Sequence, residues 1–144
     1  MKSTICKIAI SVILSCFILF PLSAKQLFVS PEGDDSADGS SSGNAFKTLS
    51  KAVDAAEEGD EIVLLGIIDI SQEPADKIYN SDAYNKNNQG VKILDKGLTI
   101  SGDPNQTRTK TGFTGNKTTT CLRLDGLNKK VTIRNLTIKE GNPT

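Results

Sequence analysis

Residues 129–139 read KKVTIRNLTIK and contain two short β-branched segments separated by one asparagine. A looser version of this phrase occurs earlier, where residues 96–102 read KGLTISG. β-Branched residues that alternate with polar ones are typical of short strands with one buried face. A strand phrase that returns after loops of unequal length predicts a solenoid, in which each turn of the chain, or rung, adds one strand beside its equivalent.

Such a solenoid gives each side chain of a rung a direction. Inward apolar residues stack on their equivalents in the next rung, with neighbouring strands about 4.8 Å apart. We expect the polar alternates Thr99, Thr132, Arg134 and Thr137 to face solvent. Asn135 separates two strands at a bend, where asparagine tolerates a left-handed backbone.

The rest of the chain contributes further strands and one helix. Apolar, β-branched segments predict strands at residues 26–29, 61–65, 67–70, 91–94, 98–101, 121–124, 131–133 and 136–138. Helical spacing connects the apolar residues Phe46, Leu49, Val53 and Ala56. This predicts a helix with Asn44 as its N-cap and Gly59 after its end. Its single apolar stripe indicates that it covers other structure.

These elements divide the chain into three parts. Residues 1–24 form a leader, residues 25–60 an N-terminal cap of strand, loop and helix, and residues 61–144 the rungs. Two polar segments, 71–90 and 102–119, interrupt the rungs, and we expect both to be long loop insertions at the surface.

The composition excludes several classes of function. The chain has 144 residues, with 17 Lys and Arg against 17 Asp and Glu, and it contains no His and no Trp. The balanced charge gives no basic excess for nucleic acid, so we expect no nucleic-acid partner. Without His there is no Ser-His-Asp or Cys-His nucleophile pair and no His-based metal site.

The leader matches a secretory signal peptide. Lys2 and Lys7 supply a positive start, residues 8–22 are almost entirely apolar, and small residues lead to a predicted cleavage after Ala24. The apolar run is shorter than the roughly 20 residues that cross a bilayer as a helix. Lipidation at Cys16 is the alternative, but the apolar run continues past it. The predicted location is therefore outside the cytoplasm: secreted, periplasmic or at the cell surface.

Cleavage would leave Cys121 as the single cysteine of the mature chain, because the other two lie in the leader. No intrachain disulfide can then form. The neighbours Leu122 and Leu124 indicate that Cys121 is a small apolar residue of the core.

The first part of the mature chain carries a family resemblance. Residues 27–39, LFVSPEGDDSADG, resemble the opening of right-handed parallel β-helix proteins of the pectate-lyase-like superfamily. The resemblance continues through residues 45–56 and 59–62, and the phrases at 98–102 and 131–138 look like its rungs. It implies an all-β fold, a right-handed parallel β-helix (solenoid) with an N-terminal capping α-helix, short or truncated.

The resemblance implies a fold more strongly than a function, because the superfamily contains polysaccharide lyases, hydrolases and surface adhesins. The absence of His and the balanced charge favour a non-enzymatic protein of the cell surface or envelope. Its role would be adhesion or contact with a polysaccharide or host-surface ligand. The alternative is a Ca²⁺-dependent polysaccharide lyase-like protein, or a truncated remnant of one.

Active lyases of this fold use an Arg or Lys as base beside Ca²⁺ held by carboxylates. Arg123 and Arg134, with Asp125 close in sequence, are the matching outward residues here. We assign them no catalytic role, because charges on strands are usually solvated and also discourage edge pairing.

One segment resembles half of a calcium-binding loop. Asp34, Ser36 and Asp38 place oxygen ligands at alternating positions before Gly39. The position of the closing bidentate carboxylate is occupied by Ala45, so the full motif fails. These residues also suit turns ahead of a helix. They remain the one metal candidate, with Ca²⁺ as the only cofactor under consideration.

The last predicted strand, 136–138, lies close to residue 144. An uncapped last rung would expose strand edges and apolar core to water. Three explanations stay open: a short protein that self-associates through this end, a truncated product, and a segment of a longer protein.

Overall fold

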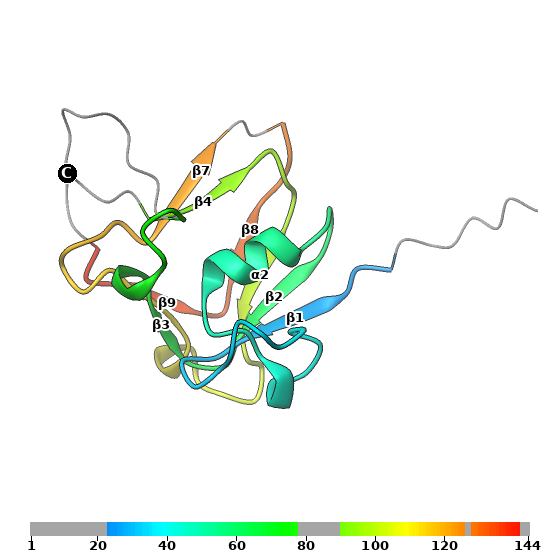
Figure 1. The fold of residues 1–144 in the computed structure, drawn as a ribbon, viewed down its shortest axis with the longest axis horizontal. Helices are drawn as coiled ribbons and strands as arrows, with labels where there is room; N and C mark the ends of the chain where they lie inside the picture. Colours follow the sequence, from blue (N-terminus) through cyan, green and yellow to red (C-terminus); the bar gives the residue numbers. More distant parts are fainter. Residues whose placement is uncertain (1–22, 78–89, 126–127, 142–144) are drawn as a thin grey trace, which may run out of the picture.

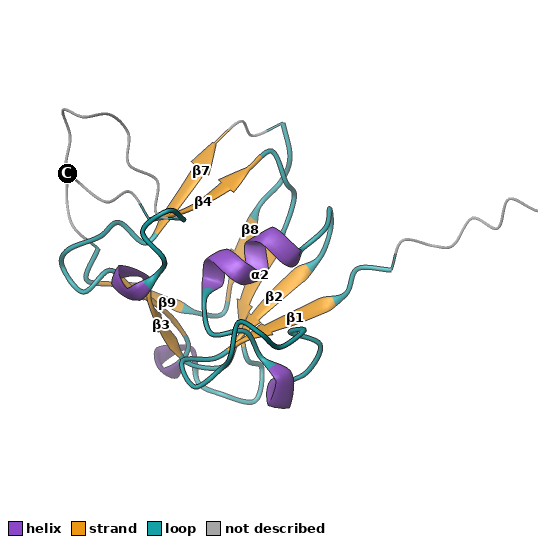
Figure 2. Cartoon of the chain, in the orientation of Figure 1, coloured by secondary structure: helices purple, strands orange, loops and turns teal. Residues whose placement is uncertain are grey.

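The computed structural model describes residues 23–77, 90–125 and 128–141 (Figure 1). Strands and loops dominate these residues, with one α-helix and three short 3-10 helices (Figure 2). The strands are β1 (Gln26–Val29), β2 (Glu61–Leu64), β3 (Ile67–Asp69), β4 (Val91–Leu94), β5 (Thr99–Gly102), β6 (Gly112–Thr114), β7 (Leu122–Asp125), β8 (Thr132–Arg134) and β9 (Thr137–Lys139). The helices are α2 (Leu49–Ala55), η1 (Ser42–Asn44), η2 (Ile70–Gln72) and η3 (Arg108–Lys110). The expected β-rich class is confirmed, and each predicted strand is found within one residue of its predicted bounds.

Every pairing between these strands is parallel. In the part of the chain that the structure describes there are three sheets, with the orders β1-β2-β5-β8, β3-β6-β9 and β4-β7. Paired residues lie between 25 positions apart (Gly112 and Thr137) and 45 positions apart (Ile67 and Gly112). Parallel neighbours need such long crossovers, because a tight hairpin can join only antiparallel strands.

The register stacks apolar residues in rows across the sheets. One row of the four-stranded sheet consists of Leu27, Ile62, Ile100 and Ile133. A row of the three-stranded sheet consists of Ile68, Phe113 and Ile138. The earlier members are buried, whereas Ile133 is 39% exposed and Ile138 is 53% exposed. The rows therefore become exposed at β8 and β9, the last strands of their sheets.

Helix α2 packs on the strands that begin two of the sheets. It contacts β1 and β4 (Figure 1). Its buried face carries Leu49, Ala52 and Val53. Phe46, just before the helix, bonds through its backbone to Phe28 and Ser30 and so occupies the outer edge of β1. The predicted helix with one apolar face is confirmed, and it covers the first strand of the largest sheet.

The predicted N-cap of this helix was wrong. Asn44 ends the 3-10 helix η1, and α2 begins after Thr48, whose hydroxyl accepts a hydrogen bond from the Lys51 amide. A hydroxyl on the residue directly before a helix can accept from an amide of the first turn that has no partner within the helix. Gly59 does follow the helix and adopts φ +89°, in the turn that leads into β2.

Two carboxylates from distant parts of the chain accept hydrogen bonds from the amides at and just before the start of α2. Asp35 Oδ1 accepts from the amides of residues 47–48, both at 2.9 Å. Glu73 accepts from the Leu49 amide at 2.7 Å, from the Ser50 amide at 3.1 Å and from the Ser50 hydroxyl. The first amides of a helix have no partner within the helix, so these hydrogen bonds hold its start in place.

The two predicted loop insertions need correction. The segment 102–119 contains strand β6, with Phe113 fully buried at its centre, so it is not one continuous surface loop. Within 71–90, Glu73 is buried against α2 rather than at the surface. The remainder of that segment, residues 78–89, lies outside the described residues.

Candidate functional site

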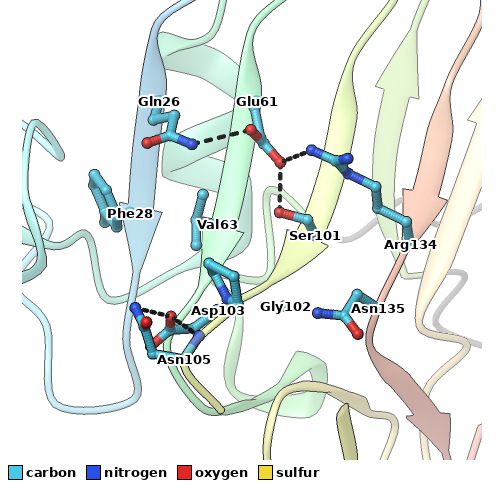
Figure 3. Close-up of a pocket in the computed structure, with 11 residues that line it drawn as sticks. Gln26, Phe28, Glu61, Val63, Ser101, Gly102, Asp103, Asn105, Arg134 and Asn135 are labelled. Carbon is cyan, nitrogen blue, oxygen red and sulfur yellow. Dashed lines mark hydrogen bonds and ion pairs between the residues drawn. The ribbon is translucent and has the colours of Figure 1, made fainter. Parts of the chain in front are cut away.

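A groove of about 530 Å³ runs over the outer face of the four-stranded sheet (Figure 3). All four strands of that sheet and the turn after β5 contribute to its walls. The lining residues are Gln26, Phe28, Glu61, Val63, Ser101, Gly102, Asp103, Pro104, Asn105, Arg134 and Asn135.

Strand alternation places these side chains on one face. In β1, Gln26 and Phe28 are partly or fully exposed, and the residues between and after them are buried. The parallel register sets Gln26 beside Glu61 and Phe28 beside Val63. The same register sets Val63 beside Ser101. Side chains two positions apart on a strand share a face, so the groove follows directly from the pairing.

Glu61 is the centre of a polar cluster. Its Oε1 accepts from the Arg134 guanidinium and from the Ser101 hydroxyl, both at 2.7 Å, and its Oε2 accepts from the Gln26 amide at 3.1 Å (Figure 3). Burial raises the pKa of Glu61, but the hydrogen bonds from Ser101, Arg134 and Gln26 outweigh it, and the pKa lies below its ordinary value. The carboxylate is therefore ionised at neutral pH.

A tight turn after β5 forms another wall of the groove. Asp103 Oδ1 accepts from the backbone amide of Asn105 at 2.9 Å and from its side-chain amide at 3.1 Å. The Gln106 side chain ties the turn to the Leu65 carbonyl at 3.0 Å. The backbone hydrogen bond from Asn105 holds the pKa of Asp103 below its ordinary value. The turn thus presents an anchored carboxylate beside an amide side chain.

Asn135 closes the groove at the end of β8. Its φ of +54° confirms the left-handed bend that the sequence predicts between the two last strands. The bend allows β9 to enter the three-stranded sheet while β8 stays in the four-stranded one.

The groove combines one aromatic surface with polar groups that can donate and accept hydrogen bonds. Its only aromatic side chain, Phe28, lies beside amide, hydroxyl and carboxylate groups. The Glu61 carboxylate and the Arg134 guanidinium, 2.7 Å apart, form the ion pair at its centre. Pockets with an apolar surface and a few converging polar groups are typical of small-molecule sites.

The predicted metal ligands lie in a loop outside this groove. Asp34 Oδ1 accepts from the Ser36 amide at 2.8 Å, and Asp38 Oδ1 accepts from the Ser40 amide at 3.0 Å and hydroxyl at 2.7 Å. Backbone hydrogen bonds from Ser36 and Ser40 lower the pKa of Asp34 and Asp38. Across residues 23–77, 90–125 and 128–141, no three His, Cys, Asp or Glu side chains gather as a metal site would require. Calcium binding by Asp34, Ser36 and Asp38 stays a prediction.

The outward arginines belong to different sheets. Arg123 lies on β7 and contacts Asp125 at 3.1 Å, and Lys92 approaches the same carboxylate at 3.3 Å. Arg134 lies on β8 and contributes to the groove. The structure therefore separates the two arginines and gives each an acidic partner.

Cys121 is a core residue, as predicted. It is 5% exposed and belongs to the hydrophobic cluster that includes Phe113 and Ile93. Burial raises the pKa of its thiol, and the Asp69 carboxylate adds to that rise. Such a thiol stays protonated and unreactive at neutral pH.

Most of the groove was missed from the sequence. Gln26, Glu61 and Arg134 come from three strands, and Arg134 is 73 residues from its partner Glu61. The one available signal was the outward alternation of the strands, which singled out Arg134 and neither Glu61 nor Phe28.

No family model, curated protein or solved structure matches the chain. None of the helices in the described ranges combines the length and apolar character of a membrane span.

Proposed function

We propose that this protein is an exported parallel β-helix that binds carbohydrate chains without cleaving them, at a cell surface or in the envelope. The three sheets would be the faces of the solenoid, and α2 would be the cap of its first rung. The exclusively parallel pairing, the long separations between partners and the rows of stacked apolar residues support this fold. Residues 1–24, with their signal-peptide pattern, support export.

The groove on the four-stranded sheet is the observation that carries carbohydrate binding. A sugar ring has apolar C–H faces and a rim of hydroxyls that both donate and accept hydrogen bonds. Phe28 offers an aromatic surface to such a face, and Gln26, Asn105 and Asn135 offer amides that can meet the rim. This combination within one open hollow matches a sugar better than it matches a peptide or a nucleic acid.

The charged pair supports binding without cleavage. The lyase reaction needs a free base on the outer face of a strand, and Arg134 is the one Arg or Lys among the described residues that line the groove. Its guanidinium lies 2.7 Å from Glu61, so abstraction of a proton by Arg134 would first require this pair to break.

The proposal is tested with the chain from Lys25 onward on a glycan array that includes uncharged and acidic polysaccharides. We expect binding, and we expect Phe28→Ala to weaken it about tenfold because the stacking surface is lost. The matched control is Leu124→Ala, which removes an exposed apolar side chain from the two-stranded sheet, outside the groove, and should leave binding unchanged. Circular dichroism verifies that both variants fold.

Two results would contradict the proposal. The absence of binding to every glycan would remove the carbohydrate role. Release of unsaturated sugars from pectin, alginate or chondroitin in the presence of Ca²⁺ would instead favour the lyase alternative.

A further inference from the structure

The groove continues beyond the four-stranded sheet. A second hollow of about 920 Å³ lies along β1, between residues 24–28 and the loop at residues 38–42. The two hollows share Gln26, Phe28 and Glu61 as lining residues, so they meet at these side chains. Each lies within the range of about 300–1,000 Å³ that encloses a drug-sized ligand. Because each hollow is large enough for a ligand of its own, a carbohydrate that filled both hollows would be a chain of several sugar units.

The charges along this path are unfavourable for an acidic ligand. The two cations that line it, Lys25 and Arg134, each have an acidic partner. Lys25 Nζ lies 3.8 Å from Asp60, and Arg134 lies 2.7 Å from Glu61. An approaching carboxylate would therefore find no uncompensated cation among the described lining residues.

Three carboxylates also line the path: Glu61, which is paired with Arg134, and Asp38 and Asp103, which form no ion pair with the described residues. Hydrogen bonds stabilise the ionised forms of Glu61 and Asp103, as described above. An anionic polymer would meet like charges along its length, and such contacts disfavour binding. Ionised carboxylates accept hydrogen bonds from sugar hydroxyls, so an uncharged glycan meets no such penalty.

We propose that the ligand is a linear, uncharged glycan of several sugar units that lies across Phe28 and occupies both hollows. This inference rests on the carbohydrate binding proposed above. It assigns Ser40, Ser41 and Asp38 to the far end of the site and the Glu61 cluster to its middle.

The test is calorimetric titration of the chain from Ser23 onward, which retains Ala24 of the second hollow, in a buffer with EDTA. The probes are the β-1,4-linked hexamers and trimers of glucose, xylose and mannose, and hexagalacturonate as the acidic counterpart. We expect at least one uncharged hexamer to bind about tenfold more tightly than its trimer and than hexagalacturonate.

Two variants separate the length and charge of the ligand. Ser41→Trp should fill the second hollow and reduce the hexamer's affinity to that of the trimer, whereas Ser36→Trp, in the same loop but outside the hollow, should not. Glu61→Gln should release Arg134 from its partner and raise the affinity for hexagalacturonate about tenfold.

The outcomes distinguish the two proposals. If the array detects glycan binding but no uncharged hexamer binds, or hexagalacturonate binds equally well, the inference is overturned and the proposed function stands. A hexamer that binds no more tightly than its trimer also overturns it. If neither assay detects any glycan, both proposals fail.

Discussion

Gly112→Ala is expected to lower the free energy of unfolding by at least about 3 kcal/mol, a cost associated with backbone strain and severe overlap. Gly112 adopts φ +147°, a conformation that residues with a side chain rarely adopt. A Cβ at this position would lie 1.8 Å from the Thr137 carbonyl oxygen. That oxygen belongs to the backbone of β9, so no side-chain rotation can relieve the overlap. The backbone pairing of β6 with β9 would have to be distorted or broken.

Gly43→Ala is the matched control for this substitution. No atom lies within 4 Å of a Cβ built at Gly43, which sits in η1. We expect its unfolding free energy to stay within about 0.5 kcal/mol of the parent chain. Urea denaturation followed by circular dichroism measures both variants. Failure of Gly112→Ala to fold while Gly43→Ala folds counts as the expected result, and near-equal stability of the two would contradict the close approach of β6 and β9.

Strand β6 is the one observed strand that the sequence did not predict. Local alternation was enough for β1, β2 and β4, because each carries several apolar residues in a short run. β6 has three residues and only Phe113 is a large apolar one. Its strand conformation depends on Phe113 packing in a row with Ile68 and Ile138, which are 45 and 25 positions away. Local strand propensity does not indicate contacts between residues so far apart in the sequence, so it does not predict β6.

The groove was beyond prediction for the same reason. The family resemblance and the strand phrases favoured stacked parallel strands, and the parallel pairing agrees with them. Which outward residues share a groove depends on register, and the register depends on how many residues each crossover contains. Glu61 therefore has no recognisable partner in the sequence, although Ser101 and Arg134 lie on the two strands that follow β2 in the sheet.

Glu73→Ala is expected to cost about 3 kcal/mol of unfolding free energy. The substitution removes the acceptor for the Leu49 amide, the Ser50 amide and the Ser50 hydroxyl at the start of α2. Each buried donor without an acceptor costs about 1–3 kcal/mol, and partial relaxation reduces the total. Glu32→Ala, which removes an exposed acid from the loop after β1, should cost less than about 0.5 kcal/mol in the same urea titration.

The pH dependence of this cost tests the environment of Glu73. Burial raises the pKa of Glu73; the hydrogen bonds from Ser50 and Leu49 oppose the rise, and the Asp35 carboxylate adds to it. Because the folded pKa lies above the unfolded value of about 4.3, the stabilisation is complete below that value and decreases as the pH rises through the folded pKa. The cost of Glu73→Ala should therefore be larger at about pH 4 than at pH 7. A cost that increased with pH would contradict this prediction. It would mean that the hydrogen bonds from Leu49 and Ser50 stabilise the ionised carboxylate more than burial destabilises it.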